Sequence, residues 1–185
     1  GGVLFNKAMT TLIEYPADLA GGYAIPDNVT SIGPNAFYNQ TTLTGVTMPD
    51  SVTNIGENAF AYCYGLTNMV IPDSVTSIGD EAFEFCHGLT GVTIGTNVTN
   101  IGEHAFAYCY GLTNVAIPDS VTSIGDYVFD NCLDLTSMMI GNSVTNIGDE
   151  AFYYCSSLTR VMIPNGVTSI GEHAFTYCSG LTNVV

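Results

Sequence analysis

The chain repeats itself every 23 residues, and this period constrains its fold more than any other feature of the sequence. One aliphatic column recurs at this spacing without an insertion: Ile25, Met48, Ile71, Ile94, Ile117, Ile140 and Ile163. Further columns of valine, isoleucine, glycine, phenylalanine and leucine keep the same register through seven repeats. A unit of this length cannot enclose a core of its own, so successive units must stack and join their apolar columns. The sequence therefore predicts a solenoid.

One short segment of each repeat has the alternation of a β-strand. In the third repeat, Met69 and Ile71 are expected to point into the core, whereas Asn68 and Val70 point outward. Pro72 follows directly and ends the strand, because proline has no N–H to donate to a ladder. Stacked coils bring these strands side by side, so we expect a parallel sheet along one face.

The return side of each repeat carries a helix-start signal. Ser77 and Asp80 have the spacing of a capping box, which predicts a single helical turn after them. Gly79, between them, is expected to supply a backbone angle that a side chain would resist. The predicted fold is an α/β repeat solenoid, with its parallel sheet on the concave face and short helical turns or irregular structure on the convex face.

The repeat also carries a family pattern. Residues 71–90 read Ile-Pro-Asp-Ser-Val-Thr-Ser-Ile-Gly-Asp-x-Ala-Phe-x-x-Cys-x-x-Leu-Thr. This string resembles the BspA-like, Treponema-type class of leucine-rich repeats, and the resemblance covers residues 25–185 as an array of seven 23-residue repeats. It implies a right-handed leucine-rich-repeat coil in a secreted or cell-surface protein, often an adhesin that contacts host proteins or other cells. Residues 1–24 look like the small hairpin that often precedes such arrays.

Four residues depart from the pattern, one of which is Asn131 in the otherwise aromatic column before the cysteines. Gln40 stands where the first repeat should carry cysteine, and Gly95 and Gly141 replace the turn proline. No signal peptide opens the chain, so we expect a mature or excised piece of a protein.

The charge balance and the length of the apolar runs each argue against one class of partner. Lys and Arg together number 2 against 17 Asp plus Glu, for a formal net charge of -15. Nucleic-acid binding needs cationic side chains that displace counterions from phosphates, so we expect no nucleic-acid partner. The apolar runs are only a few residues long, so we also expect no membrane insertion.

The cysteines and histidines do not form a reactive group in the sequence. The cysteines recur once per repeat: Cys63, Cys86, Cys109, Cys132, Cys155 and Cys178. Uniform spacing favours a reduced, buried ladder, although Cα atoms about 5 Å apart would also permit disulfides between neighbouring coils. No nucleophile, base and orienting group recur together, so we predict a protein that is not an enzyme, with no catalytic residue, no cofactor and no metal site.

Two polar columns have both a structural and a binding interpretation. The acidic column is Glu57, Asp80, Glu103, Asp126, Asp149 and Glu172. We expect it to face helix starts and water, with calcium bridging as the alternative. The aromatic column is Tyr62, Phe85, Tyr108, Tyr154 and Tyr177, for which stacking between coils is expected ahead of contact with a partner.

The outward strand positions form the candidate binding surface. The residues chosen are Asn68, Val70, Asn114, Ala116, Ser137, Met139, Arg160 and Met162. Met139, Arg160 and Met162 cluster toward the C-terminal end, and exposed Met and Arg are enriched in interface cores. The alternative is a plain β-face with scattered apolar residues.

Two functions remain open from the sequence. The first is a non-enzymatic, surface-exposed or secreted recognition or adhesion scaffold that binds a protein or glycan through the solenoid face. The second is a structural protein that stacks end to end into filaments. This second hypothesis rests on residues 181–185, which stop inside a strand and leave the last repeat without a cap.

Overall fold

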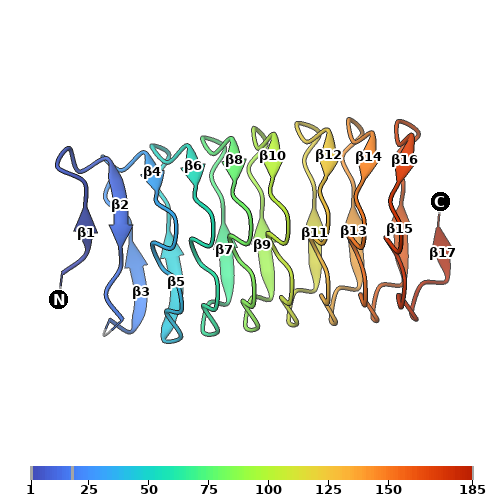
Figure 1. The fold of residues 1–185 in the computed structure, drawn as a ribbon, viewed down its shortest axis with the longest axis horizontal. Helices are drawn as coiled ribbons and strands as arrows, with labels where there is room; N and C mark the ends of the chain where they lie inside the picture. The colour runs from blue at the N-terminus through green and yellow to red at the C-terminus, as the bar shows by residue number, and fades with distance from the viewer. Residues whose placement is uncertain (1, 18, 185) are drawn as a thin grey trace.

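The computed structural model describes residues 2–17 and 19–184. The chain forms a row of stacked coils, with its two ends at opposite ends of the row (Figure 1). Each coil of the array has one longer strand and one strand of two residues. The repeat solenoid predicted from the period is therefore confirmed.

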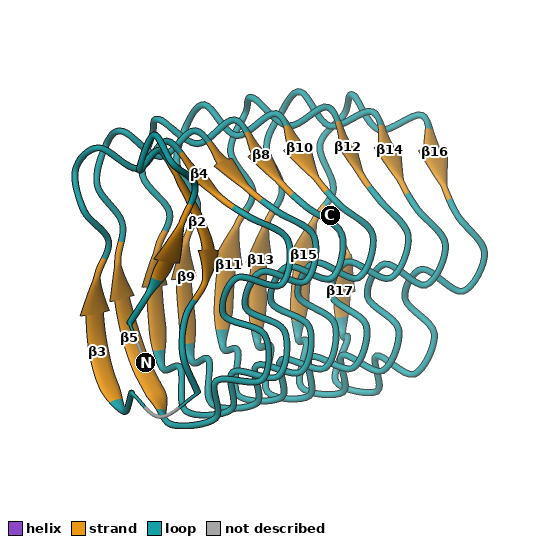
Figure 2. Cartoon of the chain, turned by 60° about the vertical axis from the view of Figure 1, so that its left-hand side comes forward, coloured by secondary structure: helices purple, strands orange, loops and turns teal. Residues whose placement is uncertain are grey.

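The strands fall into two rows on different sides of the coil, and loops join them (Figure 2). The longer strands are β3 (Gly21–Ala24), β5 (Leu43–Thr47), β7 (Asn68–Val70), β9 (Gly91–Thr93), β11 (Asn114–Ala116), β13 (Ser137–Met139) and β15 (Arg160–Met162), and β17 (Asn183–Val184), of two described residues, continues their row. The short strands are β4 (Ser31–Ile32), β6 (Asn54–Ile55), β8 (Ser77–Ile78), β10 (Asn100–Ile101), β12 (Ser123–Ile124), β14 (Asn146–Ile147) and β16 (Ser169–Ile170).

The longer strands form the expected parallel sheet. Strands β7 to β17 pair in chain order, and β3 pairs with β5 ahead of them. Partners are one repeat apart, as in Met139 opposite Met162. Each residue of a column therefore lies beside its equivalent in the next coil, which is what joins the columns into one core.

The N-terminal segment extends the short-strand row. Strand β1 (Leu4–Phe5) pairs antiparallel with β2 (Thr11–Glu14), and β2 pairs parallel with β4. Leu12 and Tyr15 are buried in the same apolar core as the repeats. The first regular coil thus packs on a segment that has the strands of a coil but lacks its return side.

Phenylalanine rings run through the centre of the core. The column is Phe37, Phe60, Phe83, Phe106, Phe129, Phe152 and Phe175. Successive rings stack with centroids 4.7 to 5.5 Å apart. This distance is close to the spacing of about 4.8 Å between neighbouring strands, so the rings and the sheets share one repeat distance.

The helical turn expected after Ser77 is wrong, because the described residues contain no helix and the return side is a series of turns. The backbone N–H groups of Glu81, Phe83 and Phe85 donate to carbonyls of the next coil at 2.8 to 2.9 Å. The N–H groups between them close turns within the same coil, as Glu84 does to Glu81 at 3.0 Å. A helix would direct all of these donors along its own axis. Alternate N–H groups instead donate to the next coil, so a helix cannot form here.

Two residues per turn adopt the left-handed backbone conformation that this zigzag requires. In the third coil they are Glu81, with φ 56°, and Phe85, with φ 57°. Such angles are unfavourable for bulky side chains and persist where the surroundings determine them. Here the hydrogen bonds to the next coil hold the conformation.

The carboxyl group of Asp80 bonds to the next coil and does not cap a helix. Its Oδ1 accepts the N–H of Glu103 at 3.0 Å. Asp126 and Asp149 make the same bond to the coils after them, at 2.8 and 2.7 Å. The three aspartates of the acidic column therefore join coils, and the expected role at a helix start is wrong because no helix forms there.

Gly79 is needed for close packing and not for its backbone angle. Among the described glycines only Gly21 has a positive φ, of 94°. A Cβ placed on Gly79 would lie 2.6 Å from the backbone nitrogen of Glu57 in the preceding coil. The glycine column thus allows the backbones of successive coils to touch.

One coil junction is looser on the short-strand side. The short strands pair continuously up to β10 and again from β12, but β10 and β12 are not paired. Val128 stands in the column where Ala105 and Ala151 stand in the neighbouring coils. A Cβ on Gly125 would meet the Cγ2 of Val128 at 3.6 Å and no backbone atom closer. The gap in the ladder thus coincides with a larger side chain and a wider spacing of the backbones at this junction.

This contrast between glycines gives a direct test of coil packing. Gly79→Ala is expected to destabilise the protein by about 1–3 kcal/mol, because the new methyl group overlaps the preceding backbone. Gly125→Ala is the matched control, since its methyl group finds ordinary van der Waals space. Urea unfolding followed by circular dichroism measures both midpoints. Equal midpoints for the two variants would contradict the packing role.

Candidate functional site

The structure places all eight candidate binding residues on one exposed surface. We call it the long-strand face, meaning the outward side chains of β5, β7, β9, β11, β13 and β15. Asn68 and Val70 are exposed and Met69 between them is buried, and β11, β13 and β15 repeat this pattern. The predicted alternation is confirmed, and the binding role of the eight residues stays a prediction.

The methionine patch, Met139, Arg160 and Met162, is the most apolar part of this face. Met139 is 68% exposed and Met162 is 53% exposed. They lie opposite each other on β13 and β15, and an Nη2 of Arg160 is 3.8 Å from the sulfur of Met162. The patch therefore contains two flexible thioether side chains and one guanidinium group.

A hollow lies near the middle of the face, over β9. Gly91 has no side chain there, and Asn68 and Asn114 stand on the strands at either side. The hollow has a volume of about 490 Å³ and is also lined by Thr90 and Thr113. Thr90 Oγ1 lies 3.4 Å from Asn68 Oδ1. The hollow is therefore lined by side-chain amides and hydroxyl groups.

The threonine rim beside this face has a structural role that the sequence did not indicate. Each threonine hydroxyl donates to the carbonyl of the equivalent threonine one coil earlier, at 3.0 to 3.4 Å. The donors are Thr67, Thr90, Thr113, Thr136, Thr159 and Thr182. These hydroxyls hold the coils together, and the spacing of 23 was the only signal for them.

The aromatic column stacks between coils as predicted. Phe85 lies between Tyr62 and Tyr108, with centroids 4.8 and 4.4 Å away. Tyr64 and Tyr110, which the sequence also suggested would reinforce this column, form a second stack with His87 between them at 4.8 and 4.4 Å, and the part played by His87 was not predicted. Burial lowers the pKa of His87, so its imidazole stays neutral within this stack.

Two carboxyl groups on the return side are buried enough to titrate abnormally. Asp130 is 5% exposed, and Asn131 Nδ2 donates to its Oδ1 at 2.7 Å. Burial raises the pKa of Asp130, and burial together with the charges of Glu81 and Asp130 raises the pKa of Glu84 to about 7. Neither residue was singled out from the sequence, because a single charged residue in a variable column carries no signal.

The cysteines are free and buried, one in each coil from Cys63 to Cys178. The thiol of Cys63 donates to the carbonyl of Phe37 at 3.0 Å, and equivalent bonds recur along the column. Burial raises the pKa of Cys63 to about 12, which keeps the thiol protonated. No group of three or more His, Cys, Asp or Glu side chains in the described part of the chain is arranged to hold a metal ion.

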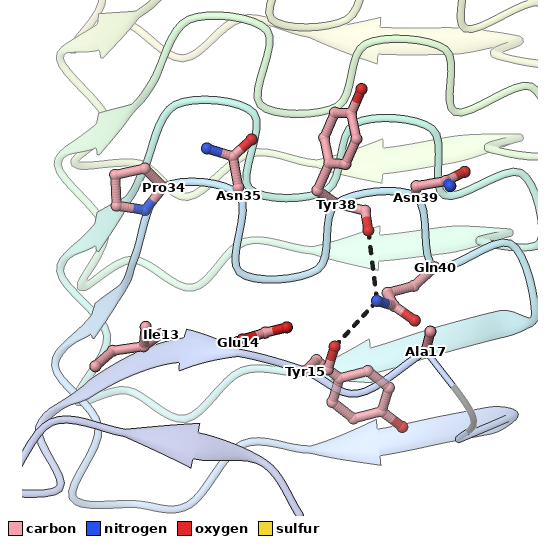
Figure 3. Close-up of a pocket in the computed structure, with 9 residues that line it drawn as sticks. All are labelled: Ile13, Glu14, Tyr15, Ala17, Pro34, Asn35, Tyr38, Asn39 and Gln40. Atoms are coloured by element: carbon pink, nitrogen blue, oxygen red, sulfur yellow. Dashed lines mark hydrogen bonds between the residues drawn. The ribbon is translucent and has the colours of Figure 1, made fainter. Parts of the chain in front are cut away.

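A cleft of about 470 Å³ lies where the first coil meets the N-terminal segment (Figure 3). We call it the first-coil cleft; residues 13–17 form one wall and residues 34–40 the other. Figure 3 shows Glu14 between the walls and the Gln40 amide reaching from one to the other. Gln40 Nε2 donates to the carbonyl of Tyr15 at 3.0 Å. Its Oε1 is buried and has no partner among the described residues.

The stacked coils and their columns define a leucine-rich-repeat solenoid. The family described as the BspA type leucine-rich repeat region, of six copies, matches residues 22–133 and 99–185. The chain belongs to this family. No protein of curated function matches the chain.

Solved structures show the same fold. A leucine-rich cell surface protein from Faecalibacterium prausnitzii A2-165 has 36% sequence identity and a TM-score of 0.88, over 98% of this chain and 52% of that one. The leucine-rich repeat protein of T. pallidum has 29% identity and a TM-score of 0.89, over 94% of this chain and 83% of that one. This chain thus spans about half the length of the Faecalibacterium protein.

The raised pKa of Glu84 predicts how stability depends on pH. The pKa is 4.5 for an ordinary glutamate and about 7 in the folded chain, so the folded state binds the proton more tightly. The stability that this proton provides is complete below pH 4.5 and is lost as the pH rises through 7. Glu84→Gln stays neutral, so at pH 8 it should melt higher than the wild type by roughly 1–3 °C, and at pH 4.5 no higher.

Differential scanning calorimetry across this range makes the comparison. Glu103→Gln removes the same charge from an exposed position and serves as the control. Equal gains in both variants would assign the effect to net charge and not to burial.

Proposed function

We propose that this chain is a recognition module of a secreted or surface-exposed protein, and that it binds a protein partner through its long-strand face. The methionine patch is the observation that carries the proposal. Most apolar side chains of the chain belong to the columns that form the core. Met139 and Met162, by contrast, are exposed and lie side by side on neighbouring strands. An apolar patch that a fold does not need for its own core is typical of a binding surface.

The chemistry of the patch favours a protein partner. Thioethers adapt their shape to an apolar surface, and both Met and Arg are enriched in the centres of protein interfaces. Arg160 is one of only two basic residues in a chain with 17 acidic ones. It lies on the same strand as Met162 and within reach of its sulfur, which supports contact with an acidic or carbonyl-rich rim of the partner.

A glycan is the second candidate ligand, and the hollow over β9 is the observation that favours it. Asn68, Asn114 and the neighbouring threonines offer donors and acceptors of the kind that sugar hydroxyls need. The outward positions from β5 to β15 carry no aromatic ring on which a sugar could stack. This difference places the protein ligand first.

Surface exposure and the lack of an enzymatic role belong to the same proposal. Leucine-rich-repeat families are generally non-enzymatic scaffolds, and the Faecalibacterium relative is described as a cell surface protein. Residues 2–17 and 19–184 contain no helix long and apolar enough to cross a bilayer. End-to-end assembly into filaments stays a prediction.

The proposal predicts a loss of binding when the patch is made polar. The test is a panel of immobilised secreted and surface proteins and glycans, with hits measured by biolayer interferometry. The double variant Met139→Ser and Met162→Ser should weaken protein binding at least about tenfold, because exposed anchors dominate interface energy. Met9→Ser removes another exposed methionine, far from the patch, and should bind like the wild type. Undiminished binding by the double variant, or hits on glycans alone, would overturn the protein-binding proposal.

A further inference from the structure

We infer that the first-coil cleft is a second binding site, which accepts the guanidinium group of an arginine side chain from a partner protein. The inference starts from the hydrogen bonds that join one return turn to the next. In the second coil, the carbonyls of Glu57, Ala59 and Ala61 accept N–H groups from the coil before them, at 2.9, 2.7 and 2.8 Å. Each coil therefore presents a row of three acceptors that its predecessor fills.

The first coil has the same row, but the segment before it has no return turn to fill it. The equivalent carbonyls are those of Pro34, Ala36 and Tyr38, one repeat earlier. Ala36 receives the N–H of Tyr15 at 2.7 Å, and Tyr38 receives only a long bond of 3.4 Å from the Gln40 amide. The carbonyl of Pro34 has no donor among the described residues. Acceptors thus outnumber donors along this wall of the cleft.

Gln40 adds a further acceptor beneath the cleft. It occupies the cysteine column and repeats the cysteine's task, since its Nε2 donates to the carbonyl of Tyr15. A cysteine thiol at this position would have no further polar atom to satisfy. The glutamine amide also carries Oε1, which has no hydrogen-bond partner among the described residues. Gln40 as a whole is only 7% exposed, and its Oε1 is buried. A buried acceptor of this kind requires a donor.

Glu14 determines the charge that the ligand must carry. Its carboxylate lies between the two walls, as Figure 3 shows, and no lysine or arginine lines the cleft. A ligand for this cleft must be cationic and must offer several N–H donors from one flat group. A guanidinium has five donors in a rigid fork that suits carboxylates, whereas an ammonium is a compact point charge.

The one arginine of this sequence lies far from the cleft. The chain has two basic residues, Lys7 and Arg160. Arg160 lies on β15, at the far end of the row of coils from β2 (Figure 1). The strongly acidic character of the chain, with a net charge of -15, favours a basic partner.

The test titrates the protein with two probes of the same shape. Nα-acetyl-arginine methylamide carries the guanidinium, and Nα-acetyl-citrulline methylamide replaces it with a neutral urea. Amide chemical shifts of the ¹⁵N-labelled protein at low ionic strength report where each probe binds. We expect the arginine probe to shift the amides around Glu14, Tyr15 and Gln40, and to bind at least about tenfold more tightly than the citrulline probe.

Two variants and a control separate the site from general attraction to an acidic protein. Glu14→Gln should weaken arginine binding at least about fivefold by removing the charge, and Gln40→Cys should weaken it by removing Oε1 while restoring the residue of the other coils. Glu57→Gln removes an acidic side chain outside the cleft and should change nothing.

The same spectra check that each variant is folded, and if Glu14→Gln does not fold, the citrulline probe and Gln40→Cys still decide. Equal affinity for both probes, or shifts spread along the acidic column, would overturn the inference. Because this cleft lies apart from the methionine patch, either result leaves the proposed function of the long-strand face untouched.

Discussion

Hydrogen bonds between the backbones of neighbouring coils are the interaction on which the rest of this structure depends. They run along the long strands, along the short strands and through the return turns, and the strand ladders are interrupted only between β5 and β7 and between β10 and β12 among the described residues. Such bonds need the backbones to approach closely, and the side chains have to permit that approach. Gly79 permits it by having no Cβ, and Phe83 permits it because flat rings stack at the same spacing as the strands.

The sequence predicted the features that depend on the identity of the residues in one column of the repeat. Met69 inward and Val70 outward follow from alternation, and the core columns follow from the period. The prediction of a helical return turn was wrong for a physical reason. Ser77 and Asp80 have the same spacing whether the carboxylate accepts an N–H from its own turn or from the coil after it. Spacing describes neighbours along the chain, and the bond that decides the structure joins residues 23 positions apart.

The candidate site was predictable to a similar degree. The exposure of Met139 and Met162 follows from their strand positions, and the structure adds that they lie opposite each other. The first-coil cleft could not be foreseen, although Gln40 had been recognised as a departure from the cysteine column. Its meaning depends on a return turn that the N-terminal segment lacks, and the pattern of the repeats contains no information about such a segment.

The distribution of hydrogen bonds separates the residues that build the array from those available to a partner. Threonine hydroxyls, cysteine thiols and the carboxylates of Asp80, Asp126 and Asp149 are engaged with neighbouring coils. A substitution at any of these positions changes the contact between two coils. The exposed side chains of Met139 and Arg160 make no hydrogen bond to a neighbouring coil among the described residues, so the stacking of coils depends on them less. A repeat protein can therefore acquire a binding surface where its side chains are not used for stacking, and the outward positions of Met139, Arg160 and Met162 are of this kind.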